Sequence, residues 1–231
     1  VIPAKHTTPE SSDIQEFLAK MRASEEKAVA IEVSSHAIDL QRIRGVDFDV
    51  GVFTNIGHDH LDFHGSFSDY LATKASFFEN LGAIPDSRKN GEEARISIIN
   101  VDDPNSGFIL SKTHTQVLTY GISDASASIT AKEIRLCGKT TSFVASTPHA
   151  SFPVSLNLKG IFNVYNALAA IACGLAKGLD PDTISSGLRA LKGVPGRFEA
   201  VDEGQPFSVI VDYAHTPDSL ESVLREARRL G

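Results

Sequence analysis

Short apolar runs alternate with amphipathic stretches along most of the chain. Residues 28–35 (AVAIEVSS) and 48–55 (FDVGVFTN) are rich in β-branched side chains, which is typical of strands buried on both faces of a sheet. Residues 66–82 (SFSDYLATKASFFENLG) repeat apolar positions with the period of a helix, after a serine suited to cap it. Residues 94–100 and 115–121 predict two more strands around another helix. This alternation predicts an α/β fold, with a mainly parallel sheet flanked by helices.

Helices are also expected near the start of the chain and in its second half. Residues 7–24 predict a turn followed by a capped helix, and a further helix begins near His36. From about residue 127 to 157 the pattern changes to alternating strands separated by turn residues, which predicts a small antiparallel sheet. Two helices follow, over residues 160–179 and 180–191.

Glycine and proline end the helical pattern near residue 194, in GVPGRFEAV, and indicate a domain boundary there. Residues 1–193 then form one domain. Residues 194–231 predict strand, strand and helix, too little to bury a core alone. They are interpreted as the beginning of a second domain.

The composition is that of an ordinary globular protein: 231 residues, 42% hydrophobic, with a net charge of −7. This negative charge argues against a general nucleic-acid surface, which needs a basic excess. No stretch reaches the roughly 20 apolar residues of a membrane span, and no leader opens the chain. We therefore expect a cytoplasmic protein without a membrane partner. Because the chain starts without Met and stops in a helical pattern, we also expect a fragment of a longer protein.

Polar residues follow the first two predicted strands, where ligands of parallel sheets bind. Glu32 ends the first strand, and residues 54–60, up to His60, follow the second. A carboxylate and an imidazole converging there would suit a divalent cation on a phosphate. Alternatively, Glu32 caps a helix and the histidines only decorate a loop. His58, His60 and His64 also suggest zinc, but no other pair of zinc ligands completes the set, which makes zinc the weaker option.

Other candidate residues are ambiguous when taken singly. Lys74 lies in mid-helix, where a solvated surface lysine is the simpler interpretation. Asn163 and Asn166 share one face of a first helical turn, where they either cap the helix or present amides to a ligand. Asp212 and Tyr213 could contact a ribose and a base, but a capped strand-to-helix turn explains them equally well.

Seven motifs occur together in a fixed order: TTPES, EVSSHAIDLQRI, TNIGHDHLDFHGSFSDYLATKASFF, IINVDDPNS, GIFNVYNALAA, GVPGRFEAV and VDYAHTPDSLE. In this order they resemble the Mur ligases, most of all the branch that adds the third residue to the peptidoglycan stem peptide. The resemblance spans essentially the whole chain. It implies most of a P-loop NTPase-like central ATPase domain with the beginning of a Rossmann-like C-terminal domain. No G-x-x-x-x-G-K-[ST] motif occurs, so the fragment alone is expected to be inactive.

The resemblance implies an ATP-dependent ligase with an acyl-phosphate intermediate. The substrates would be UDP-MurNAc-L-Ala-D-Glu and an amino acid, and the cofactors Mg²⁺ and CO₂, the latter held as a lysine carbamate. The added amino acid cannot be read from the sequence. A monomer without nucleic-acid partners is expected.

The resemblance also assigns roles to individual residues. Glu32 and His60 match magnesium ligands, and Lys74 matches a lysine that becomes carbamylated and joins them, so these three are the expected catalytic residues. His58 falls where the family pattern varies, and His64 is interpreted as support for the loop. The expected substrate-binding residues are Thr7, Thr8, Ser34 and Arg42. The expected nucleotide-binding residues are Asn163, Asn166, Arg197, Asp212, Tyr213 and His215.

Three other interpretations compete with this one. Folylpolyglutamate synthase shares the ATPase core and the carbamylated lysine. A non-catalytic relative without a P-loop is a second alternative, and a zinc hydrolase built on His58, His60 and His64 is a third.

Overall fold

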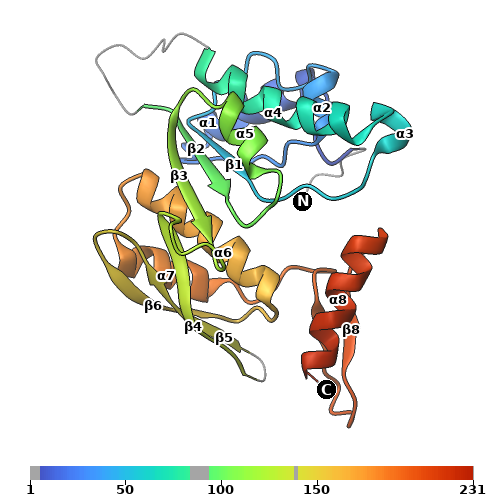
Figure 1. The fold of residues 1–231 in the computed structure, drawn as a ribbon, viewed down its shortest axis with the longest axis vertical. Coiled ribbons are helices and arrows are strands. Elements are labelled where there is room, and N and C mark those ends of the chain that lie inside the picture. The colour runs from blue at the N-terminus through green and yellow to red at the C-terminus, as the bar shows by residue number, and fades with distance from the viewer. Residues whose placement is uncertain (1–5, 84–93, 138–139, 231) are drawn as a thin grey trace. The chain divides into compact units, whose positions relative to one another are not determined.

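The computed structural model describes residues 6–83, 94–137 and 140–230 (Figure 1). Its helices and strands follow one another in the order α1 (Ser11–Ala23), α2 (Ser35–Asp39), β1 (Val50–Phe53), α3 (Leu61–His64), α4 (Phe67–Ala83), β2 (Ile96–Asn100), α5 (Ser106–Lys112), β3 (Gln116–Gly121), β4 (Ile129–Cys137), β5 (Thr140–Ser146), β6 (Ser151–Leu156), α6 (Ile161–Ala176), α7 (Pro181–Ala190), β7 (Glu199–Val201), β8 (Val209–Val211) and α8 (Pro217–Leu230).

Six strands form one mixed sheet in the order β1-β2-β3-β4-β5-β6. Helices connect β1 to β2 and β2 to β3, as in the βαβ units of parallel sheets, and β3 pairs parallel with β4. The pairs β4–β5 and β5–β6 are antiparallel. The predicted fold class is therefore confirmed, and the antiparallel strands continue the sheet that the parallel ones begin.

The core of this sheet is built on α6. Ile98 and Ile99 of β2 are fully buried, as are Leu168 and Ile171 of α6, which packs against β2 and β4 (Figure 1). Helix α7 packs against α6 and β6. A Cβ at Gly174 would come within 2.8 Å of Ile184 Cγ1, so only glycine lets α6 and α7 approach this closely.

Two predicted helices begin with the expected caps. The backbone N–H of Asp69 donates to Ser66 Oγ over 3.1 Å at the start of α4. The N–H of Thr183 donates to the Asp180 carboxylate over 2.9 Å at the start of α7. These side chains satisfy backbone groups that a helix leaves open at its first turn.

The prediction of a strand over residues 28–35 is wrong. Residues 28–34 form no strand, and Val29 is 43% exposed. A β-branched run becomes a strand only when a neighbouring strand takes its backbone hydrogen bonds, and within the described residues the sheet ends at β1. Two backbone groups of this run, the carbonyl of Glu32 and the N–H of Ser34, bond instead to the side chain of Thr8.

The last part of the chain forms the predicted strand, strand and helix. β7 and β8 pair antiparallel, with Ala200 opposite Ile210, and α8 follows. None of the helices in the described residues is long and apolar enough to cross a membrane.

By its internal contacts the chain divides into two compact units. Unit 1 consists of residues 1–51, 60–95 and 108–116, and unit 2 consists of residues 52–59, 96–107 and 117–231.

Candidate functional site

In unit 1, Thr8 forms hydrogen bonds with other predicted substrate-binding residues. Its side chain is fully buried. Its hydroxyl donates to the backbone carbonyl of Glu32 over 2.8 Å and accepts from the backbone N–H of Ser34 over 2.9 Å. The Ser34 hydroxyl lies 3.2 Å from Thr8 Oγ1 and accepts from the N–H of Ala37, which caps α2. Thr8, Glu32 and Ser34 therefore form one connected group.

Arg42 joins this group from the loop after α2. Its Nη1 donates to the carbonyl of Thr8 over 3.2 Å, and its Nη2 lies 2.9 Å from the Glu10 carboxylate. The arginine side chain is 12% exposed, and its Nε is buried without a hydrogen-bond partner among the described residues. A cationic side chain therefore carries a buried N–H group that no described residue accepts. Thr7 is exposed beside the group.

His60 has an unusual backbone conformation at the start of α3. Its φ of 57° and ψ of 23° fall in the left-handed region, which non-glycine residues adopt rarely and at a cost. The N–H groups of Phe63 and His64 donate to its carbonyl over 3.2 and 3.0 Å. The first turn of α3 therefore fixes the backbone from which the His60 imidazole projects.

The His60 ring belongs to an aromatic cluster of unit 1 formed by His36, His60, Phe63, His64 and Tyr70. The ring of His36 lies edge-on to that of His60, with centroids 4.8 Å apart. Tyr70 contacts His60 at 5.9 Å and stacks on His64 at 5.2 Å. His64 Nε2 also lies 2.9 Å from the Ser35 hydroxyl. His64 thus ties α3 to α2, in keeping with a supporting role.

Lys74 contacts the same tyrosine. Its Nζ lies 5.3 Å from the centre of the Tyr70 ring, within the range of a cation–π contact. Two of the expected metal-site residues, His60 and Lys74, therefore lie against one buried ring. The third, Glu32, has an exposed side chain.

Sequence reasoning missed His36 as a member of this group, although it lies inside the motif EVSSHAIDLQRI. Burial lowers the pKa of the His36 imidazole, and the neighbouring His60 and His64 lower it further. The neutral imidazole is thus favoured.

The described residues contain no group of three or more His, Cys, Asp or Glu side chains arranged to hold a metal ion. The zinc alternative required such a group from His58, His60 and His64. His64 instead faces Ser35 and Tyr70.

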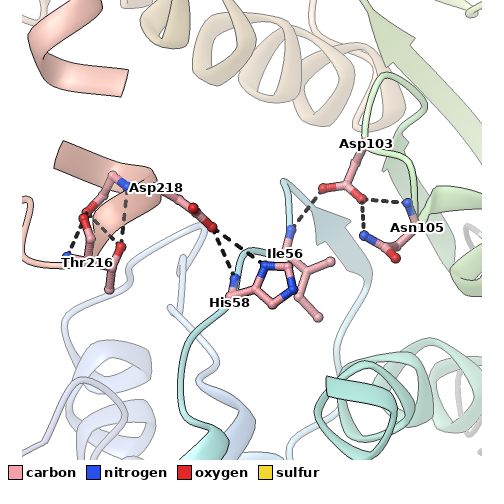
Figure 2. A network of polar contacts seen from close by, with 7 residues as sticks. Ile56, His58, Asp103, Asn105, Thr216 and Asp218 are labelled. Atoms are coloured by element: carbon pink, nitrogen blue, oxygen red, sulfur yellow. Dashed lines mark hydrogen bonds and ion pairs between the residues drawn. The ribbon is translucent and has the colours of Figure 1, made fainter. Parts of the chain in front are cut away.

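In unit 2, polar residues hold the loop that follows β1. The Asp103 carboxylate accepts the N–H of Ile56 over 2.9 Å, and the side-chain amide of Asn100 donates to the carbonyl of Thr54 over 2.7 Å. Figure 2 shows Asp103 between Ile56 and Asn105, and His58 facing Asp218 of α8. The N–H of His58 donates to Asp218 over 3.3 Å.

The predicted nucleotide-binding asparagines lie in the first two turns of α6. Asn163 is buried and its amide donates to the carbonyl of Lys159 over 2.7 Å. The amide of Asn166, which is exposed, donates to Asn163 Oδ1 over 3.1 Å. The two side chains therefore face each other, as their spacing indicated.

Asn163 and Arg197 both line a pocket of unit 2 with a volume of about 690 Å³. The lining does not include Asp212, Tyr213 or His215. Asp212 and Tyr213 contact residues of the lining, and His215 contacts Tyr213. The Arg197 guanidinium lies 5.1 Å from the centre of the Tyr213 ring, and the N–H of Phe198, which lines the pocket, donates to Asp212 over 2.7 Å. Tyr213 is 65% exposed.

Asp102 is a further, half-buried polar centre that the sequence did not reveal. Its carboxylate accepts the N–H groups of Ile122, Ser123 and Asp124 and the hydroxyl of Tyr165. Burial alone would raise the pKa of Asp102, but these hydrogen bonds to the charged form bring it below its usual value.

Two domain models match the chain. Residues 2–174 match the Mur ligase middle domain, and residues 196–231 match the Mur ligase glutamate ligase domain. The chain belongs to the Mur ligase family. The resemblance identified from the sequence motifs is thereby confirmed.

Relatives of this Mur ligase with assigned names point to one branch. The UDP-N-acetylmuramoyl-L-alanyl-D-glutamate–2,6-diaminopimelate ligases of Bacillus velezensis and Geobacillus kaustophilus are both 45% identical to it, over 98% and 99% of the chain. A solved structure of a ligase with the same name superimposes with a TM-score of 0.80 at 27% identity, covering 97% of this chain and 44% of that one. The chain spans about 45% of the length of these curated relatives.

Proposed function

We propose that the protein carrying this chain is the ligase that adds the third amino acid of the peptidoglycan stem peptide to UDP-MurNAc-L-Ala-D-Glu, and that this amino acid is 2,6-diaminopimelate. The observation that carries the proposal is 45% identity, over 98% of the chain, to proteins named for that reaction. The energy comes from ATP: the substrate carboxylate takes the γ-phosphate, and the amine of the incoming amino acid displaces phosphate to form the amide.

Glu32, His60 and Lys74 are the residues that would hold Mg²⁺. Carboxylate oxygens and one imidazole suit a hard divalent cation that keeps several of its waters. The contacts of His60 and Lys74 with the single ring of Tyr70 support a shared role for these two residues. When bound, Mg²⁺ would neutralise the charge that develops on the transferred phosphoryl group.

Lys74 would contribute as a carbamate. The neutral amine adds to CO₂, its nitrogen forms a bond to the carbon, and one proton is released to solvent. The product carries a negative charge, which suits a metal ligand, whereas an ammonium group does not.

Thr7, Thr8, Ser34 and Arg42 would bind the UDP-muramoyl dipeptide. The Arg42 Nε, which is buried and has no hydrogen-bond partner in the described part of the chain, supports this role, because a phosphate or carboxylate oxygen suits such a donor.

Asn163, Asn166, Arg197, Asp212, Tyr213 and His215 would bind ATP. The pocket that Asn163 and Arg197 line has the volume expected of a small-molecule site, about 300–1,000 Å³. The exposed Tyr213 ring offers a face for base stacking. The domain boundary near residue 194, a monomeric state and a cytoplasmic location belong to the same proposal.

Phosphate release from ATP by the full-length protein tests this function. With Mg²⁺, bicarbonate and UDP-MurNAc-L-Ala-D-Glu present, we expect release that depends on 2,6-diaminopimelate and is lost when the UDP substrate is omitted. Lysine and glutamate in place of diaminopimelate serve as matched controls.

Release only with lysine would keep the ligase but change the amino acid. Release only with a folate and glutamate would replace the proposal with folylpolyglutamate synthesis. No release under any of these conditions would favour a non-catalytic relative.

A further inference from the structure

The His60 imidazole is held from one side by His36 of α2. The two ring centroids are 4.8 Å apart and the ring planes are 89° to each other, the edge-to-face arrangement that aromatic pairs prefer. His36 in turn packs on Phe63, with centroids 4.1 Å apart and an interplanar angle of 36°. The His36 ring is therefore itself constrained between two neighbours.

The backbone of His60 is constrained independently of its ring. Its left-handed conformation is maintained by the N–H groups of Phe63 and His64, which donate to its carbonyl. Strained conformations persist where the surrounding structure determines them, and they cluster at functional sites. With the backbone fixed by α3, the direction of the imidazole depends on the side chains packed around it.

Three successive residues of α2 and its cap reach three different partners. Ser34 caps α2 and lies 3.2 Å from Thr8 Oγ1, and Ser35 lies 2.9 Å from His64 Nε2. The next residue, His36, contacts His60. α2 thus connects the expected substrate-binding group to the expected metal ligand through short contacts.

We propose that His36 is a positioning residue for His60: its ring holds the His60 imidazole in the orientation in which a nitrogen can bind a divalent cation. The inference rests on the proposed function, in which His60 is a metal ligand. His36 acts through the shape of its ring, so phenylalanine can replace it and leucine, of similar size but without a ring, cannot.

The test is Mn²⁺ binding to the full-length protein without turnover, followed by electron paramagnetic resonance. An edge-to-face contact of usual strength predicts Mn²⁺ affinity weakened about threefold to tenfold in His36→Leu, and within about twofold of wild type in His36→Phe. The matched control is His58→Ala, which removes an imidazole that is 73% exposed and is not a member of this cluster. It should leave Mn²⁺ affinity within about twofold of wild type, since this exposed side chain is assigned neither to bind the metal nor to orient His60.

A kinetic measurement separates positioning from catalysis. The Mg²⁺ concentration for half-maximal ligation should rise in His36→Leu by the same factor as the Mn²⁺ dissociation constant. At saturating Mg²⁺ its kcat should return to within about twofold of the wild-type value, because the ligand itself is intact.

Mn²⁺ binding to His60→Ala, measured in parallel, distinguishes failure of the positioning role of His36 from failure of the metal assignment of His60. If His60→Ala weakens Mn²⁺ binding and His36→Leu does not, the positioning role is wrong and the metal assignment stands. If His60→Ala binds Mn²⁺ as wild type does, His60 is not a ligand, and the inference fails together with that part of the proposed function. Equal loss in His36→Phe and His36→Leu would also overturn the inference, because the ring would then not be the feature that matters.

Discussion

Two groups of expected functional residues differ in how the fold holds them. In unit 1, the fully buried side chain of Thr8 bonds to the backbone of Glu32 and of Ser34, and the side chains of His60 and Lys74 contact Tyr70. In unit 2, two members of the expected nucleotide-binding group are open to solvent: Tyr213 is 65% exposed and Arg197 also lies at the surface. The buried contacts of the first group are formed before any ligand binds, whereas the exposed Tyr213 and Arg197 side chains have surface left for a ligand to cover. Substitutions should therefore affect chemistry and stability in the first group, and mainly nucleotide affinity in the second.

The largest effect is expected at Lys74. Lys74→Ala removes the group that would become the carbamate, and the loss of a charge-stabilising group of this kind predicts a decrease in kcat of about 1,000-fold. Ligation is measured by phosphate release from the full-length protein. Added formate or acetate should restore part of the activity by supplying a carboxylate, and full activity without such addition would remove Lys74 from the site.

Substitution of Thr8 should show how much its buried hydrogen bonds contribute to the free energy of unfolding. Thr8→Val keeps the shape but leaves the Glu32 carbonyl and the Ser34 N–H without their partner, which should destabilise the protein by about 1–3 kcal/mol. Urea unfolding measures this loss. Thr8→Ser is the control and should recover most of it, and a valine variant as stable as wild type would mean that these bonds contribute nothing net.

Tyr213 should show the opposite behaviour. Because its ring is exposed, Tyr213→Leu should leave stability within about 0.5 kcal/mol of wild type. If the ring stacks on the base, the KM for ATP should rise about fivefold or more. Tyr213→Phe keeps the stacking face and should retain the wild-type KM, and an unchanged KM in both variants would place the adenine elsewhere.

A pH-dependent effect is expected at Asp102, which lies in unit 2 and forms several hydrogen bonds, as Thr8 does in unit 1. Its lowered pKa means that the folded state favours the carboxylate, so its contribution to stability is present above about pH 4 and is lost as pH falls through the lowered folded-state pKa. Asp102→Asn should therefore be less stable than wild type at pH 7, with a difference that narrows toward pH 3.

Urea unfolding across that pH range measures the effect. Tyr165→Phe, which removes one of the four donors that Asp102 has among the described residues, should show a smaller difference. A difference that does not change with pH would contradict the account of Asp102.

The hydrophobic pattern along the chain correctly predicted those helices and strands that have a neighbouring element to pack or pair with. Strands β2 to β6 and helices α4, α6 and α7 lie where the hydrophobic periodicity and the caps indicated. Residues 28–34 carry the same apolar pattern as β2 but form no strand, because a strand needs a neighbour and periodicity does not report one.

The candidate site was predictable as a set of motifs and not as a set of contacts. The spacing of Asn163 and Asn166 predicted one helical face, and their side chains do meet. The contacts of Arg42 with Thr8 and of His36 with His60 join residues from separate segments, which no local pattern encodes. Asp102 and Asp103 appeared only as part of the motif IINVDDPNS, and their hydrogen bonds depend on loops distant in the sequence.

The comparison of His60→Ala with His58→Ala in the full-length protein tests the central claim most directly. His60 lies in the aromatic cluster of unit 1, whereas His58 is exposed and faces Asp218 in unit 2. We predict that His60→Ala lowers kcat for ligation about 100-fold, as loss of a metal-site group does, and that His58→Ala stays within about twofold of wild type. Equal losses in the two variants would contradict the account, because the metal site would then not be built on His60.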